Sequence, residues 1–218
     1  MSVQGSNTVV GLFDDIHQAR DAVQELLKSG FDRSEVNLVA HGAAQEYADM
    51  FDDNGHYSHL TQESVDNHVV ASGKVGGIGA AIGGLGGLLL GLAMLTIPGV
   101  GPVVVAGPLA TAVVGAGAGF AVGGMIGGFT NIGVSEIDAE AYSEAIRRGA
   151  TAVVVKADVD RAARAAEVIN RHQPVDVQNR IQAWRTSGWT RFDPAARPFT
   201  VDEITAERRS YLSSRPVG

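Results

Sequence analysis

The chain contains no cysteine, and one long stretch of it contains no charge. The absence of cysteine excludes disulfides, thiolate metal sites and a cysteine nucleophile, and it fits a reducing compartment. Basic residues are also few, since 17 lysines and arginines are outnumbered by 24 acidic residues and the net charge is −7. Because the C-terminal arginines alternate with acids, the chain is a poor candidate for binding nucleic acid. The first residues, MSVQGSNTVVGLFDD, have no basic segment followed by an apolar run, so no secretory signal is expected.

The uncharged stretch runs from Val75 to Ser135 and holds most of the 28 glycines. It separates two parts of ordinary globular composition, so it defines the expected organisation of the chain. We expect the first half of a globular domain with an acidic loop at 1–72, a glycine-zipper helical hairpin at 73–134, the second half of the domain at 135–182, and a C-terminal arm with a short helix at 183–218.

The flanking parts predict an α+β domain. Short β-branched or alternating runs predict strands, and apolar residues at helical spacing predict helices. The order is β-α-β, then helix-β-α-β, which is a ferredoxin-like split β-α-β arrangement with the uncharged stretch inserted after the second strand. We expect its helices on one face of the sheet, with the other face available for dimerisation. The strands are expected at 8–13, 34–41, 151–158 and 175–181, and the helices at 16–30, 135–149 and 159–173.

The uncharged stretch predicts two helical arms, at about 73–97 and 108–130, joined by a turn at Pro98, Gly99, Gly101 and Pro102. Each arm carries glycines at intervals of four, which places them on one stripe of a helix. Glycine costs about 1 kcal/mol inside a helix relative to alanine, so such a stripe needs a reason, and close approach of another helix supplies one. The predicted packing and oligomerisation residues are Gly79, Gly83, Gly87, Gly91, Gly115, Gly119, Gly123 and Gly127.

Two environments suit this hairpin. Each arm reaches the roughly 20 residues needed to cross a bilayer, where close helix packing is the main attraction between helices. Lys74, Arg147 and Arg148 flank the stretch and favour both of its ends in the cytoplasm. The alternative is a homo-oligomer in solution that buries the glycine-rich hairpin as its core or wall. We therefore expect self-association, with a lipid bilayer as the favoured partner.

Three segments together resemble bacterial heat-induced general stress proteins of the YflT-like kind. They are TVVGLFDDIHQARDAVQELLKSGF, the apolar stretch with IPGVGPVVVAGPLA, and EAIRRGATAVVVKAD. The similarity is to the longer versions, which carry a glycine-zipper hairpin inside the stress domain, and it covers about residues 8–190. The resemblance implies a stress-associated protein without an established reaction, located at the bacterial inner membrane with its domain in the cytoplasm. A wholly cytoplasmic protein is the alternative.

The C-terminal arm, AWRTSGWTRFDPAARPF, is predicted to be extended. Thr200 and Glu203 have the spacing of a capping box that opens a short helix. Trp184 and Trp189 have three possible roles: covering the domain core, anchoring the arm on a neighbouring subunit, or contacting a membrane interface. We retain them as possible intersubunit anchors.

No catalytic, cofactor-binding or metal-binding residue is predicted. His56, His59 and His68 lie near acidic residues, but their spacing matches no metal motif, so a solvated acidic loop is the better interpretation. Lys74 precedes the glycines instead of following them, which excludes a phosphate loop. The hydroxyls of Ser72, Ser143 and Thr151 have no sequence context of a hydrolase triad.

The expected function is therefore non-enzymatic: a stress-associated homo-oligomer without a small-molecule ligand. A ligand sensor that uses an exposed sheet face is a further alternative, for which only Lys156 and Asp158 offer polar groups.

Overall fold

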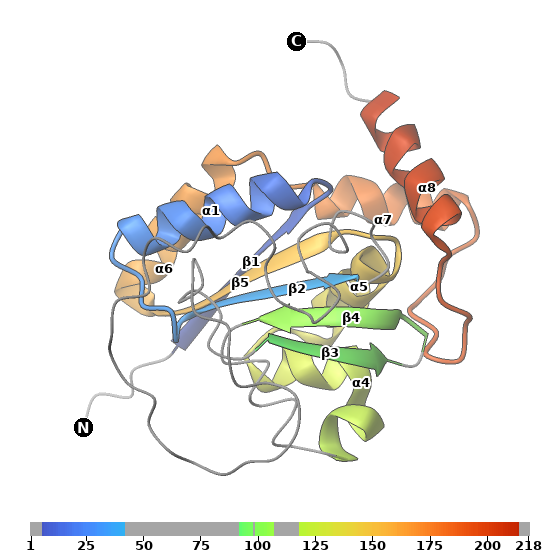
Figure 1. Ribbon diagram of the computed structural model, residues 1–218, viewed down its shortest axis with the longest axis horizontal. Helices are drawn as coiled ribbons and strands as arrows, with labels where there is room; N and C mark the ends of the chain where they lie inside the picture. Colours follow the sequence, from blue (N-terminus) through green and yellow to red (C-terminus); the bar gives the residue numbers. More distant parts are fainter. Residues whose placement is uncertain (1–5, 42–91, 98, 107–117, 214–218) are drawn as a thin grey trace, which may run out of the picture.

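The computed structural model describes residues 6–41, 92–97, 99–106 and 118–213 of the chain (Figure 1). Its fold is α+β, as the sequence predicted. The strands are β1 (Ser6–Phe13), β2 (Val36–His41), β3 (Leu92–Ile97), β4 (Gly101–Ala106) and β5 (Thr151–Asp158). The helices are α1 (Ile16–Lys28), α4 (Ala118–Asn131), α5 (Glu136–Arg147), α6 (Val159–Arg171), α7 (Val177–Thr186) and α8 (Val201–Ser213).

The strands form one antiparallel sheet in the order β1-β5-β2-β4-β3 (Figure 1). β1 and β2 each pair antiparallel with β5, so they run parallel to each other, and α1 lies between them in the chain. This is the split β-α-β unit expected from the flanking parts. The hairpin β3–β4 extends the sheet beyond β2, with His41 paired to Val103. Two strands of the uncharged stretch therefore belong to the same sheet as its flanks.

Helices cover both faces of the sheet. Successive side chains of a strand point to opposite faces, and β5 shows the division. Val153 and Val155 pack with α1 and α6, whereas Ala152 and Val154 belong to the larger cluster built from α4, α5 and α7. The prediction that helices cover one face only is wrong, because the chain itself supplies the second layer.

The helix ends follow local capping signals. The Asp15 side chain accepts a hydrogen bond from His17 N at 2.7 Å and starts α1, and Ser135 Oγ accepts one from Asp138 N at 3.2 Å to start α5. Before α8, Thr200 and Glu203 bond reciprocally, since Thr200 N donates to Glu203 Oε2 at 2.9 Å and Glu203 N donates to Thr200 Oγ1 at 3.3 Å. The capping box predicted at Thr200 and Glu203 is thus confirmed.

Residues 175–181 do not form the predicted fourth strand. α7 begins after Asp176, whose side chain accepts a hydrogen bond from Asn179 N at 3.1 Å. Ile181 and Trp184 lie three residues apart on this helix, and both are buried in the core. The strand prediction is wrong because the alternating pattern of the segment concealed an N-cap followed by an apolar helical pair. The finer assignment to a ferredoxin-like fold, which required this strand, is not confirmed.

The first predicted helical arm is contradicted at Leu92–Ile97, and the segment expected to join the two arms contains a strand, Gly101–Ala106. Leu92–Ile97 and Gly101–Ala106 are paired strands, with Leu92 opposite Ala106 and Ile97 opposite Gly101. The residues Val103–Val105 are β-branched and buried, and their strand lies between β2 and β3. Hydrogen bonds to these two neighbouring strands satisfy its backbone N–H and C=O groups. In the second arm, α4 is helical from Ala118 onward but is broken at Gly124, which has φ 58° and ψ −158°. Residues 73–91 and 107–117 lie outside the described residues.

Candidate functional site

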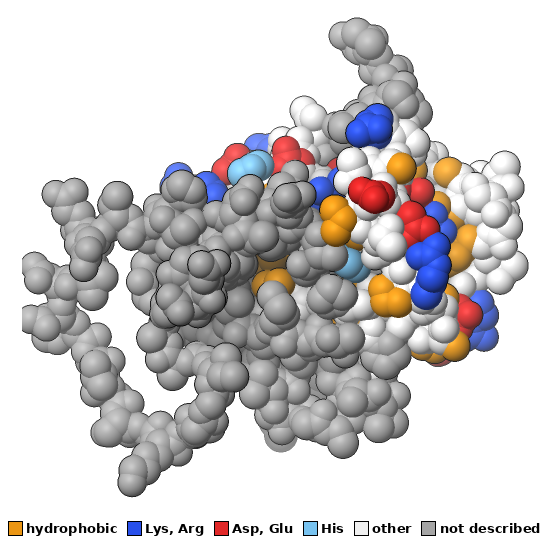
Figure 2. All heavy atoms as spheres, turned by 45° about the vertical axis from the view of Figure 1, so that its right-hand side comes forward, with side chains coloured by type: hydrophobic (Ala, Val, Ile, Leu, Met, Phe, Trp, Pro, Cys, Tyr) orange, Lys and Arg blue, Asp and Glu red, His pale blue; other side chains and the backbone are white. Residues whose placement is uncertain are grey.

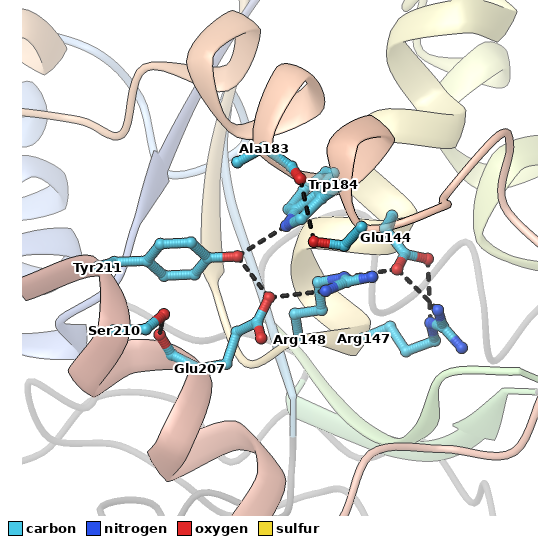
Figure 3. Close-up of polar contacts among 9 residues, drawn as sticks. Glu144, Arg147, Arg148, Ala183, Trp184, Glu207, Ser210 and Tyr211 are labelled. Atoms are coloured by element: carbon cyan, nitrogen blue, oxygen red, sulfur yellow. Dashed lines mark hydrogen bonds and ion pairs between the residues drawn. The ribbon is translucent and has the colours of Figure 1, made fainter. Parts of the chain in front are cut away.

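Glu144 on α5 is the centre of the most concentrated polar network among the described residues. Its side chain is fully buried. It accepts hydrogen bonds from Arg147 Nε at 3.0 Å, Arg147 Nη2 at 2.7 Å and Arg148 Nε at 2.6 Å (Figure 3). The spacings i+3 and i+4 bring both arginines over the carboxylate. The Arg147 pair is bidentate, which is the strongest common form of such a contact.

Arg148 carries this network from α5 to the C-terminal helix α8. Its Nη1 donates to Glu207 Oε1 at 2.7 Å. The Tyr211 hydroxyl donates to the same Glu207 oxygen and accepts a hydrogen bond from Trp184 Nε1 at 2.7 Å (Figure 3). A continuous chain of polar contacts therefore joins α5, α8 and α7, which are remote from one another in sequence.

Aromatic rings surround the two arginines. The Arg147 guanidinium carbon lies 5.0 Å from the centre of the Phe199 ring, and that of Arg148 lies 5.2 Å from the same ring and 5.0 Å from the Trp184 ring. These are cation–π distances. Phe199, in the segment before α8, is therefore held at the network by charge as well as by packing.

Arg180 on α7 extends the network toward the start of α1. Its Nη2 donates to Asp14 Oδ2 at 2.5 Å, and its guanidinium carbon lies 3.2 Å from the centre of the Tyr211 ring. Both side chains of the Arg180–Asp14 pair are mostly buried, at 15% and 11% exposed. Tyr211 thus contacts two elements, through its hydroxyl and through its ring.

Two groups of this network, the Tyr211 phenol and the Arg148 guanidinium, have pKa values raised above their ordinary ones. Burial raises the pKa of the Tyr211 phenol to about 12, and the hydrogen bond to Glu207 adds to the shift because it disfavours the phenolate. Burial lowers the pKa of the Arg148 guanidinium, but its hydrogen bonds to Glu207 and Glu144 outweigh this effect, so the pKa is raised overall. Neither group can accept a proton as a general base at pH 7.

The polar groups of this network bond mainly to one another and join α5, α7 and α8. Ser143 Oγ is buried and donates to Ala139 O at 2.7 Å within its own helix, so it is not an activated nucleophile. Thr151 is fully buried at the start of β5. In the described part of the chain, no group of three His, Cys, Asp or Glu residues is placed to hold a metal ion. The histidines at 56, 59 and 68 and the serine at 72 lie outside that part.

The segment after α7 passes over the turn between β3 and β4. A Cβ added at Gly99 would lie 2.7 Å from Pro194 Cα, and one added at Gly101 would lie 2.8 Å from Pro198 Cβ. Both glycines have positive φ, 75° and 99°. Glycine is required at both positions by the backbone conformation and by the close approach of the C-terminal segment. Of the other two predicted turn residues, Pro98 lies outside the described residues and Pro102 is the second residue of β4.

His41 also contacts this turn. The ring is buried, and its Nε2 lies 2.9 Å from Val100 O. A carbonyl only accepts, so Nε2 carries the hydrogen. Burial lowers the pKa of His41, and the positive charge of Arg208 lowers it further, while the bond to Val100 acts in the opposite direction. The neutral ring is thus part of the attachment of the β3–β4 turn to the end of β2.

The predicted glycine stripe is described only in part. Gly119, Gly123 and Gly127 lie in α4, but the break at Gly124 separates the first two from the third. A Cβ added at Gly127 would meet no described neighbour within 4 Å. Packing among the described residues therefore does not explain why position 127 is glycine. The remaining predicted positions, Gly79, Gly83, Gly87, Gly91 and Gly115, lie outside the described residues.

Both tryptophans contact the core of their own chain. Trp184 is 2% exposed, and Trp189 packs against it edge to face with ring centres 5.7 Å apart. The Trp189 Nε1 atom is buried without a hydrogen-bond partner among the described residues. Of the three roles considered for these side chains, coverage of the domain core is the one that the geometry displays.

The polar groups considered for a ligand sensor do not converge. Lys156 and Asp158 are exposed at the end of β5, and helices cover both faces of the sheet. On the surface toward the C-terminal end of the chain, acidic and basic side chains lie next to one another instead of forming a field of one sign (Figure 2). This mixture offers no basic stripe for nucleic acid.

Sequence reasoning missed the central residues of the network. Glu144, Arg147 and Arg148 lie within EAIRRGA, for which the sequence predicted a helix end, a family resemblance and, through the two arginines, the side of the membrane, but no network. The available signal was the acid placed three and four residues before two arginines. The partners Glu207 and Tyr211 had no such signal, because only the tertiary fold brings α8 to α5.

Among the residues that the structure describes, no helix combines the length and the apolar character needed to cross a bilayer. Comparisons with protein-family models, with curated proteins and with solved structures gave no match to this chain.

Proposed function

We propose that this chain is a non-enzymatic, stress-associated protein that assembles with copies of itself through its uncharged glycine-rich stretch. The observation that carries the proposal is the stretch from Val75 to Ser135, with glycines recurring every four residues and no charge. Small residues at this spacing allow close backbone contact between helices. The association with stress rests on the resemblance to bacterial heat-induced proteins, and a rise in the amount of this protein after heat shock would test it.

The described domain supports a structural role. Its most buried charges, at Glu144 and Arg147, bond to each other, and the phenol of Tyr211 is held neutral. These groups connect helices and leave no convergent set of acid, base and nucleophile in the described residues. We therefore assign the domain to anchoring the glycine-rich stretch rather than to catalysis.

Gly127 gives the sharpest test of self-association. A Cβ there meets no described neighbour within 4 Å, so we expect the single chain to tolerate a larger side chain. If α4 packs against a second copy at this glycine, Gly127→Leu reduces the assembly, as does the double variant Gly119→Leu/Gly123→Leu. Ala163→Leu, on the exposed face of α6, is the matched control. Sedimentation velocity measures the outcome, and unchanged assembly in both glycine variants would refute the packing role.

Two settings for the assembly remain to be separated. The first is the bacterial inner membrane, with the uncharged stretch in lipid and the domain in the cytoplasm. The second is an assembly in solution, favoured by the observation that Leu92–Ile97 and Gly101–Ala106 of the stretch pack into the domain's own sheet. Membranes of expressing cells washed with alkaline carbonate distinguish them. Retention in the pellet supports the first setting, and recovery as a large particle in the supernatant supports the second.

A further inference from the structure

The segment from Gly188 to Ser213, here named the strap, is attached to the rest of the chain at two separate places. It leaves α7 at Gly188, where φ is +92°, and ends in α8. Its two apolar anchors, Phe192 and Ile204, are 3% and 2% exposed. Most of its other side chains are exposed, including those of Arg191 and Arg197.

The first attachment is to the β3–β4 turn. The strap backbone at Pro194 and the Pro198 ring lie so close to Gly99 and Gly101 that a Cβ at either glycine would clash. Val100, between those glycines, is fully buried. The turn is therefore in contact both with the strap and with His41 at the end of β2.

The second attachment is to the corner between α5 and β5. Gly149, with φ +96°, lies so close to Ile204 that a Cβ would come within 2.3 Å of its Cγ2 atom. Arg208 Nη2 donates to Gly149 O at 2.6 Å, and Arg148 pairs with Glu207 at 2.7 Å. The strap therefore contacts two parts of the chain. It lies against the turn of the β3–β4 hairpin, beside which it runs in Figure 1, and it bonds to the charged network at the end of α5.

We propose that the strap is a releasable clasp that couples these two places, so that loosening α8 from α5 also loosens the β3–β4 hairpin from the sheet. The reason is geometric, because residues 193–198 lie against the turn and lead through Phe199, which the α5 arginines hold, directly into α8. Coupling of this kind is reciprocal, so a perturbation of the turn must also loosen α8. Elements that open together in this way form one cooperative unit of local unfolding.

The coupling does not depend on self-association, but one consequence rests on the proposed function. The β3–β4 hairpin is the part of the uncharged stretch that the sheet holds, so release of the clasp would free the anchor of the assembling segment. The strap then acts as a control on the attachment of that segment to the domain.

Hydrogen exchange measured by mass spectrometry on the full chain tests the coupling. Glu207→Gln weakens the contact of α8 with Arg148 without changing the size of the side chain, and Gly99→Ala places a methyl group against Pro194. We expect each variant to raise exchange about threefold or more in both regions, 99–106 and 201–213. Gly30→Ala is the matched control, because Gly30 has φ +88° but a Cβ there meets no described neighbour within 4 Å. It should change neither region.

Two results would overturn the clasp. One is a rise in hydrogen exchange that stays in the region of the substitution. Glu207→Gln would then raise exchange in 201–213 alone, or Gly99→Ala would raise it in 99–106 alone. The other is an equal rise in β5, which would mean that the whole domain opens and that no separate unit exists. If Gly99→Ala does not fold, Pro198→Gly is measured in its place, because it removes the ring atoms of the strap that face Gly101. Sedimentation of the same samples separates the two proposals: coupled exchange in a chain that never assembles would refute only the self-association.

Discussion

Replacement of Glu144 by alanine should destabilise the domain more than any exposed ion pair could. The carboxylate is fully buried and accepts three charge-assisted hydrogen bonds, two from Arg147 and one from Arg148. Those guanidinium groups are themselves 11% and 15% exposed, so water cannot replace the lost partner fully. Removal of one member of such a buried pair costs about 3–5 kcal/mol, because the remaining charges stay buried without compensation.

The assay is urea unfolding followed by tryptophan fluorescence, since Trp184 lies within the network. For a chain of this size a loss of 3–5 kcal/mol corresponds to a fall in Tm of roughly 6–20 °C. Glu167→Ala is the matched control, because Glu167 pairs with Arg164 on the surface of α6 at 59% and 50% exposure. An exposed pair contributes about 0–1 kcal/mol. If Glu144→Ala costs no more than Glu167→Ala, the burial of the network does not govern its energetics and the reasoning is refuted.

Three further predictions concern the strap and its helix. Gly149→Ala should destabilise the domain by about 1–3 kcal/mol more than Gly30→Ala in urea unfolding, because both have positive φ but only the former clashes with α8; equal losses would contradict the close contact. The Arg197 guanidinium and the Thr200 amide hold the pKa of Glu203 at about 2, so the stability that this carboxylate adds is present above pH 4.5 and is lost as pH falls toward 2. A carbon-13 NMR titration of the Glu203 carboxyl should give a midpoint near pH 2, and a midpoint near the ordinary value of 4.5 would contradict this prediction. The folded pKa of Tyr211 is raised to about 12, so the stability that its neutral phenol adds to the fold is complete below pH 10 and is lost as pH rises through 12. Ultraviolet absorbance of the folded chain should therefore show Tyr211 ionising at about pH 12.

Local signals predicted the elements whose sequence pattern and environment agree. The run TAVVVKAD forms β5 as expected, because a strand buried on both faces is continuously apolar. The helix from Val159 to Arg171 follows its apolar spacing, and the N-cap at Ser135 and the capping box at Thr200 mark the starts of α5 and α8. In each case the residues that determine the local structure, by their spacing or by capping the first backbone N–H groups of a helix, lie within a few positions of one another.

Two segments show where local patterns were not sufficient. LAMLTI, residues 92–97, is apolar and uncharged, and a short run of this kind suits a buried helix or a buried strand equally. This segment forms a strand because it pairs with β4, which in turn pairs with β2 in the main sheet. In VDVQNRI, residues 175–181, alternation favoured a strand, but the cap at Asp176 and the burial of Ile181 and Trp184 favour a helix.

The sequence by itself determined the α+β class, the split β-α-β core and most helix starts, since these depend on spacing and capping within one segment. It also determined that the stretch from Val75 to Ser135 carries no charge. Only the tertiary structure decided that part of this stretch joins the sheet, that helices cover both faces, and that Glu207 and Tyr211 meet Arg148 and Trp184. The physical reason is that backbone pairing between strands and the burial of charge depend on partners that lie tens of residues away, and no local pattern specifies them.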